Sequence, residues 1–166
     1  MQQSTLNRGI SQDEHSAIRT ALEDWADALR HKQAERVTAH HVAGFVQFSL
    51  APPLVATASK AGLNAWFDTW AGPLGLEVRD LEIATGGDIA FCHSLNRMQG
   101  RKVGGETVDL WFRQTLCFRR TGQGWKFAHQ HQSVPFYMDG SYRAAVDLTP
   151  DGGTKSAAPA ASAPRP

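Results

Sequence analysis

Apolar and polar positions alternate along residues 107–133 as they do in two long strands joined by a turn. In the first strand the apolar set is Val108, Leu110, Phe112, Leu116 and Phe118. The sequence TGQG between the strands supplies the two glycines that a tight reversal favours. Closing this turn symmetrically predicts Arg113 opposite His131 and Thr115 opposite His129.

The other face of this hairpin is a mixture of charged, imidazole and aromatic side chains. The two strands contribute Asp109, Trp111, Arg113, Thr115 and Cys117, and then Phe127, His129, His131 and Ser133. A strand surface that faces water is usually a bland set of Thr, Lys and Glu. The mixture therefore predicts that this face lines an enclosed cavity.

The residues before the hairpin predict three helices and further strands. The sequence SQDE at residues 11–14 is a capping box, and an apolar stripe with helical spacing follows it at Ile18, Leu22, Trp25 and Leu29. We expect this stripe to pack in the core, with Trp25 at the mouth of a cavity. The other expected elements are helices over 33–41 and 59–70, and strands over 45–50, 76–84 and 89–99. A symmetric turn after the last of these places His93 beside Arg113 and Arg97 beside Asp109.

Three helices followed by a run of antiparallel strands are typical of the α+β class. We expect the folded domain to span residues 11–148, after a flexible leader over residues 1–10. Residues 149–166 are rich in Pro, Ala, Gly and Ser, and this composition predicts a disordered tail that stability does not need.

Charge and composition narrow the function classes. The formal net charge of the 166 residues is +1, so no strong electrostatic attraction to nucleic acid or to a membrane is expected. Cys92 and Cys117 lie in apolar strand patterns, which favours reduced, buried thiols. The first ten residues lack the apolar core of a signal peptide, and no apolar run is long enough to span a membrane. We expect a soluble cytoplasmic protein.

The hairpin sequence DLWFRQTLCFRRTGQGWKFAHQHQSVPF resembles the C-terminal signature of SnoaL-like, ketosteroid-isomerase-like domains of the nuclear transport factor 2 superfamily. The resemblance extends back through the APP segment at residues 51–53 and covers about residues 12–138. It implies a cone in which three N-terminal helices pack on a curved antiparallel sheet. The superfamily holds isomerases, cyclases, dehydratases, silent binders and assembly domains, so the resemblance leaves the activity open. It implies no cofactor.

The candidate functional residues are His93, Asp109, Arg113, His129 and His131, with Thr115 and Ser133 nearby. A histidine with a near-neutral pKa can move a proton, and an arginine can stabilise an oxyanion, so the set suits proton transfer next to a carbonyl. The alternative is a structural network in which Arg113 pairs with Asp109. His129 and His131 could also ligate a metal with His93 or Asp109, but we predict no metal. The side chains expected to contact a ligand are Arg113, His131, Asp109, His93, Trp111, Ser133, Trp25, Phe48, Trp66 and Trp70.

Two departures from the pattern of the resembled family argue against classical isomerase chemistry. Ser49 stands where many relatives carry an Asp before the proline pair, and Gln130 stands between the two histidines where relatives often carry Glu. The sequence therefore predicts a binding protein for a small, largely apolar molecule with a carbonyl or anionic group. The alternatives are an isomerase, cyclase or dehydratase, and a non-catalytic dimerisation domain. We also expect a homodimer that forms through the sheet face carrying Leu110, Phe112, Leu116, Phe118 and Val134.

Overall fold

The computed structural model describes the backbone of residues 2–155 and the side chains from Gln12 to Lys155. Its elements in chain order are α1 (Gln2–Arg30), α2 (Ala34–Ala39), β1 (His41–Phe48), α3 (Lys60–Asp68), β2 (Gly75–Gly86), β3 (Ile89–Arg101), β4 (Thr107–Thr121) and β5 (Gly124–Ser133). All three helices and all five strands that the sequence predicts are present.

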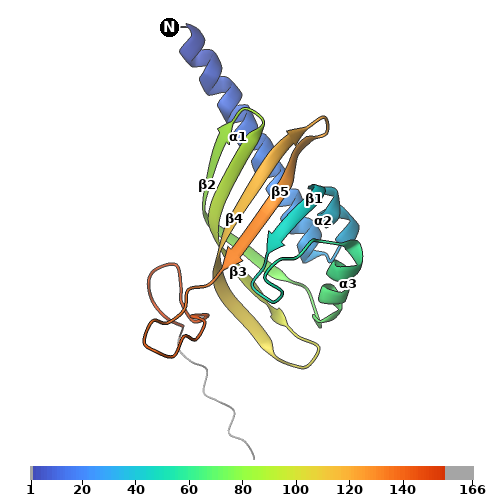
Figure 1. The fold of residues 1–166 in the computed structure, drawn as a ribbon, viewed down its shortest axis with the longest axis vertical. Helices are drawn as coiled ribbons and strands as arrows, with labels where there is room; N and C mark the ends of the chain where they lie inside the picture. Colours follow the sequence, from blue (N-terminus) through green and yellow to red (C-terminus); the bar gives the residue numbers. More distant parts are fainter. Residues whose placement is uncertain (1, 156–166) are drawn as a thin grey trace, which may run out of the picture.

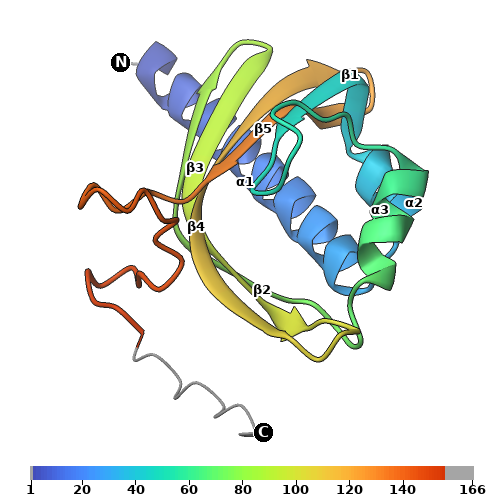
Figure 2. The same cartoon turned by 60° about the horizontal axis from the view of Figure 1, so that its bottom comes forward.

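The five strands form one curved sheet in the order β1-β5-β4-β3-β2. The sheet wraps around α1, and α2 and α3 lie on the open side of the curve (Figures 1 and 2). The sequence prediction of an α+β cone is confirmed. The sheet is mixed, because β1 pairs with β5 in the parallel direction while the other pairs are antiparallel.

The first helix starts earlier than the sequence predicts. α1 runs without a break from Gln2 to Arg30, so Ser11 lies inside the helix and is not its N-cap. The pattern Ser-x-x-Glu is equally compatible with a helix interior when no proline precedes it. α3 has the expected cap, because the Ser59 side chain accepts a hydrogen bond from the Gly62 amide at 3.0 Å.

The core lies between α1 and the concave face of the sheet. Leu116 and Phe118 of β4 are fully buried there, together with Phe127 of β5 and Ile18 of α1. Phe127 packs edge-on against Trp25 and Phe118, at ring-centroid distances of 5.3 and 4.9 Å. From the sequence, the apolar face of β4 was predicted to lie outside, as a dimer surface. That placement is wrong, because Phe112, Leu116 and Phe118 of this face are buried, and Leu116 and Phe118 share a core cluster with the apolar stripe of α1.

The predicted register between β4 and β5 is also wrong. Arg113 lies opposite Ser133, and His131 lies opposite Thr115. Phe118 pairs with Phe127 while Cys117 pairs with His129, so Ala128 is an extra residue in β5. This β-bulge changes which side of the sheet alternate residues face. Phe127 therefore points into the core, whereas the analysis placed it on the same face as the two histidines.

Two predictions about β3 have different outcomes. His93 lies opposite Thr115 rather than beside Arg113. Arg97 does reach Asp109, and its guanidinium donates to the two carboxylate oxygens at 2.8 and 3.0 Å. The structural alternative that pairs Asp109 with Arg113 is therefore wrong, because Arg97 on the neighbouring strand takes that place.

Part of the predicted tail contacts the sheet. Lys155 forms an ion pair with Asp109 at 2.6 Å, and Asp151 pairs with Arg79 at 3.4 Å. Residues 149–155 thus lie on the convex side of the sheet (Figure 2), and these two ion pairs connect them to it. Residues 156–166 of the predicted tail lie outside the described residues.

Gly100 gives a test of the packing around Trp70. A Cβ atom at Gly100 would lie 2.9 Å from two ring carbons of Trp70, closer than side chains pack. We expect Gly100→Ala to lower the free energy of unfolding by about 1–3 kcal/mol, as overpacking does. Urea denaturation measures it. Gly104→Ala is the matched control, because a Cβ there meets nothing within 4 Å. Equal stability of the two variants would contradict this packing.

Candidate functional site

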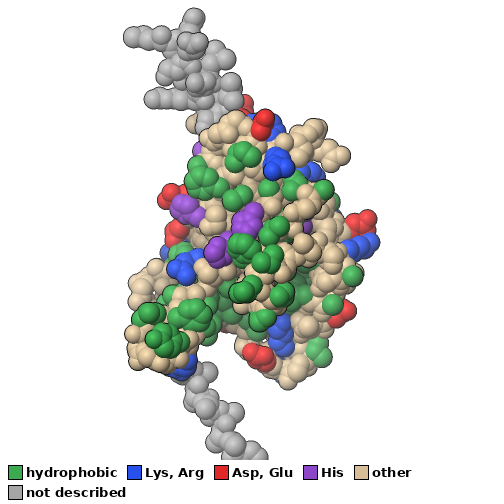
Figure 3. Space-filling model, viewed as in Figure 1, with side chains coloured by type: hydrophobic (Ala, Val, Ile, Leu, Met, Phe, Trp, Pro, Cys, Tyr) green, Lys and Arg blue, Asp and Glu red, His purple; other side chains and the backbone are tan. Residues whose placement is uncertain are grey.

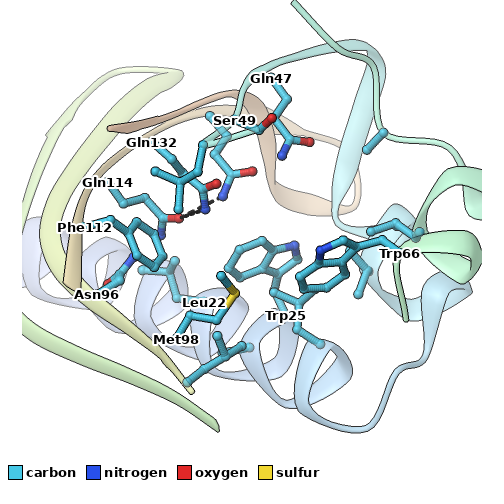
Figure 4. A pocket seen from close by; sticks show the side chains of 18 of the residues that line it. Leu22, Trp25, Gln47, Ser49, Trp66, Asn96, Met98, Phe112, Gln114 and Gln132 are labelled. Carbon is cyan, nitrogen blue, oxygen red and sulfur yellow. Dashed lines mark hydrogen bonds between the residues drawn. The ribbon is translucent and has the colours of Figure 1, made fainter. Parts of the chain in front are cut away.

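A cavity of about 830 Å³ lies between the concave face of the sheet, α1, α3 and the segment that joins β1 to α3. Strands β1 to β5 all contribute side chains to its wall. Figure 4 shows Gln114, Gln132 and Asn96 on one part of this wall, with Phe112 beside them, and the indoles of Trp25 and Trp66 on another. A cavity of this size, lined by apolar and polar side chains, is typical of a small-molecule binding site.

One part of the cavity wall is built from uncharged polar side chains of β3, β4 and β5. We call it the amide wall, and it consists of Ser94, Asn96, Gln114, Gln130 and Gln132. Ser94, Gln114 and Gln132 occupy one row across the three strands, because Gln114 lies opposite both of the others. They face inward since they alternate in phase with the buried Phe112 and Leu116.

The amides of this wall bond to one another. Gln114 Oε1 accepts from Gln130 Nε2 at 2.8 Å and from Gln132 Nε2 at 2.9 Å. Asn96 Oδ1 accepts from the Ser94 hydroxyl at 3.0 Å. These bonds fix the side chains, and the remaining polar atoms of the amides stay open to the cavity.

The wall opposite the amides is apolar. Leu22 and Trp25 of α1 and Trp66 of α3 contribute to it, and their side chains lie across the cavity from Gln114 and Gln132 (Figure 4). The α1 side chains arrive there because the stripe at spacings of three and four residues faces the sheet. The cavity therefore has an aromatic side and a hydrogen-bonding side.

Charged side chains stay at the edge of the cavity. Arg19, Glu23 and Glu77 line it but are exposed, and Arg30 is half-buried and donates to the Leu76 carbonyl at 3.1 Å. The amide wall itself contains no charged group. A ligand that contacts these amides is therefore separated from the charged side chains at the edge of the cavity.

His41 is a titratable residue of the cavity wall. Burial lowers the pKa of its imidazole to about 4, with a smaller contribution from His40, so the ring is neutral at pH 7. The ring stacks on Phe45 with centroids 3.9 Å apart, and neither ring nitrogen has a hydrogen-bond partner among the described residues. Both nitrogens are shielded from the cavity.

The predicted ligand contacts fall into two groups. Of the predicted contacts, Trp25 and Trp66 line the cavity. Ser49, which was not among them, also lines it, and its hydroxyl donates to the Ala51 carbonyl at 2.8 Å. Trp70 is buried beside Trp66 but is not part of the wall, and Lys102 covers its ring with Nζ 3.7 Å from the centroid. Phe48 lies outside, edge-on against His129 at 4.7 Å.

The polar residues predicted for the cavity lie on the convex face instead. This correction applies to His93, Asp109, Trp111, Arg113, His129, His131 and Ser133. Figure 3 shows histidine side chains among apolar ones on this outer surface. The physical reason is the burial of Leu116 and Phe118 against α1, which turns every alternate residue of β4 outward.

These outer residues do not form one site. Asp109 pairs with Arg97 and Lys155, which lower the pKa of its carboxyl to about 2. Arg113 is exposed, and His129 Nδ1 donates to the Val46 carbonyl at 2.9 Å. Within residues 12–155, no cluster of three or more His, Cys, Asp or Glu side chains is arranged to hold a metal ion.

Comparison with known proteins assigns the chain to a family. The model of the SnoaL-like domain family matches residues 18–137. The chain belongs to the SnoaL-like family. No match was found among curated proteins. No helix in the described part of this family member is long and apolar enough to cross a membrane.

Solved structures agree with this assignment. An NTF2-like protein of unknown function from Pseudomonas putida is 29% identical, with a TM-score of 0.74 over 84% of this chain and 98% of its own. An NTF2-like protein with a cystatin-like fold from Novosphingobium aromaticivorans is 18% identical, with a TM-score of 0.64 over 84% and 92%. A ketosteroid isomerase-like protein from Erwinia carotovora atroseptica is 19% identical, with a TM-score of 0.58 over 71% and 93%. The last two likenesses concern the fold alone.

Proposed function

We propose that this SnoaL-like protein binds a flat, largely apolar molecule that carries a neutral carbonyl group. The observation that carries the proposal is the amide wall facing Trp25 and Trp66 across the cavity. Indole rings offer large apolar contact area, and a few fixed amides give orientation, which is the usual composition of a small-molecule site.

The cavity wall favours a neutral ligand over an anion. Arg113, the cation that the sequence analysis assigned to an anionic group, lies on the convex face. An anion at the amide wall would lose its hydration without gaining an opposite charge, and such burial is costly. The sequence predicted a ligand with either a carbonyl or an anionic group. Of these two, we therefore propose the carbonyl.

A titration with fluorenone, a flat neutral ketone, tests this function. We expect binding by calorimetry and a rise in the thermal midpoint of the wild type. Leu22→Trp should remove binding, because Leu22 lines the cavity and an indole would fill it. Leu54→Trp is the matched control, since Leu54 is 93% exposed. Equal binding to both variants would place the ketone elsewhere and reject the proposal.

We do not propose a catalytic step for this cavity. Proton transfer next to a carbonyl needs a base that reaches the ligand. The carboxylates of Glu23 and Glu77 line the cavity only at its exposed edge, and both ring nitrogens of His41 are shielded from the cavity. Ser49 occupies the position where the sequence analysis looked for a carboxylate, and a hydroxyl alone does not act as that base.

We propose that two copies associate through the convex face of the sheet. Ile89 and Phe91 of β3 are 55% and 46% exposed there, and Phe48 of β1 is 38% exposed. Apolar side chains of this size on one open sheet face favour a partner surface, and a second copy supplies an identical one. The cytoplasmic location stays a prediction from the sequence.

Sedimentation at tens of micromolar checks the association. We expect a dimer for the wild type and a monomer for Phe91→Glu, because a carboxylate in the middle of the contact would lose its hydration. Phe136→Glu is a control at an exposed phenylalanine outside the sheet. A monomeric wild type would remove this proposal.

A further inference from the structure

We infer that the ligand's polar edge is a carbonyl with an N–H or O–H donor directly beside it, as in a lactam. This inference rests on the proposed function and narrows the ligand class. It comes from counting the donors and acceptors that the amide wall leaves free. Only the polar atoms that the wall does not use internally can contact a ligand.

Gln114 has the central position in this count. A carbonyl oxygen accepts two hydrogen bonds, and Gln114 Oε1 already accepts two, from Gln130 and Gln132. Its Nε2 group keeps both hydrogens, because no described residue accepts from it. Gln114 therefore offers a donor to the cavity.

The two neighbouring glutamines offer the opposite polarity. Each of Gln130 and Gln132 gives one amide hydrogen to Gln114, and neither Oε1 has a partner among the described residues. Neighbouring strands are about 4.8 Å apart, so a donor on β4 stands next to acceptors on β5. The complementary ligand edge has an acceptor for Gln114 and an adjacent donor for Gln130 or Gln132.

The three amides are oriented as a unit. Turning one of them alone would set two N–H groups or two carbonyl oxygens against each other, so a reversal must involve all three. In the reversed arrangement Gln114 presents an acceptor beside the donors of Gln130 and Gln132. A lactam edge, which carries one donor and one acceptor, matches either arrangement. A carboxylate has acceptors only and leaves the free amide oxygens unpaired.

Three probes of similar shape separate the contributions of the carbonyl, the adjacent donor and the apolar rings to binding. Phenanthridin-6(5H)-one carries the lactam edge, its N-methyl derivative keeps the carbonyl but loses the donor, and phenanthrene has neither. We expect calorimetry to show the lactam binding at least tenfold more tightly than either of the others, because an unpaired buried amide lowers affinity. The wild-type protein is used throughout this comparison.

Substitutions test which amides recognise the edge. Gln114→Leu should reduce lactam affinity to that of phenanthrene. Gln132→Leu, which keeps the bond between Gln130 and Gln114, should lower lactam affinity severalfold and covers the case in which the first variant fails to fold. Gln123→Leu, at the exposed turn, should behave as the wild type.

Two failures are distinguishable. Equal affinities of the three probes for the wild type would overturn the inference and leave the apolar cavity as the binding site. Failure of all three probes and of fluorenone to bind would reject the proposed function itself. A lactam preference that survives both Gln114→Leu and Gln132→Leu would also overturn the assignment to the amide wall.

Discussion

Phe118→Ala is expected to lower the free energy of unfolding by about 3–5 kcal/mol, the loss typical of truncating a buried phenylalanine. Phe118 is fully buried on the concave face of β4 and packs edge-on against Phe127 at 4.9 Å. Removing its ring leaves a cavity that Leu116 and Phe127 cannot fill without moving, because side chains in the core are closely packed. Urea denaturation followed by circular dichroism measures the change.

The control lies on the opposite face of the same strand. Arg113→Ala should change the free energy of unfolding by no more than about 0.5 kcal/mol, because Arg113 is exposed and has no ion pair among the described residues. The two variants together test which face of β4 is inside. If Arg113→Ala lost more stability than Phe118→Ala, the face of β4 that carries Arg113 would be the inner one, as was predicted from the sequence.

The elements of the fold could be predicted because their signals are local. Period-two alternation identified the strands, an apolar stripe at helical spacing identified α1, and Ser59 marked the start of α3. The start of α1 could not be predicted, since the SQDE sequence fits both a cap and a helix interior. A local pattern does not show how far a helix extends on the N-terminal side of its first apolar residue.

The orientation of the sheet could not be predicted from β4 alone. One face of β4 is apolar and the other mixes Trp, Arg and Thr, and either could line a cavity in a curved sheet. The choice depends on contacts with α1, which are far away in sequence. The bulge at Ala128 added a second error, because a single extra residue in β5 moved Phe127 to the other side from His129.

The cavity residues show the same limit. Trp25 was predicted to reach a cavity because a large indole on such a helix often lines a cavity mouth. Trp66 was predicted to do so because its helix commonly covers the cavity in the resembled architecture. Gln114, Gln130 and Gln132 were missed because a glutamine in a strand usually faces water. The available signal was their phase: Gln114 alternates with Phe112 and Leu116, so once those two are placed inside, the amide must follow.

His41→Phe is expected to remove a loss of stability on acidification. Its pKa of about 4 in the folded protein lies below the ordinary value of 6.5, so the unfolded chain binds the proton more tightly. Stability is therefore retained above pH 6.5 and falls as the pH drops towards 4. Between pH 7 and pH 5 the wild type should lose about 2 kcal/mol. His40 contributes to the lowered pKa of His41, and its own ring is hydrogen-bonded to the Asp24 carboxylate at 2.7 Å.

Urea denaturation of both proteins at pH 7, 6 and 5 measures the effect. This range lies above the lowered pKa values of Asp24, Glu35, Asp109 and Asp139, so those carboxylates contribute little to the slope. The phenyl ring keeps the stacking on Phe45 and removes two nitrogens that have no described partner, so the variant should also be more stable at pH 7 by about 1–3 kcal/mol. If the variant lost stability on acidification as steeply as the wild type, the buried neutral imidazole would not be the cause, because no other change separates the two proteins.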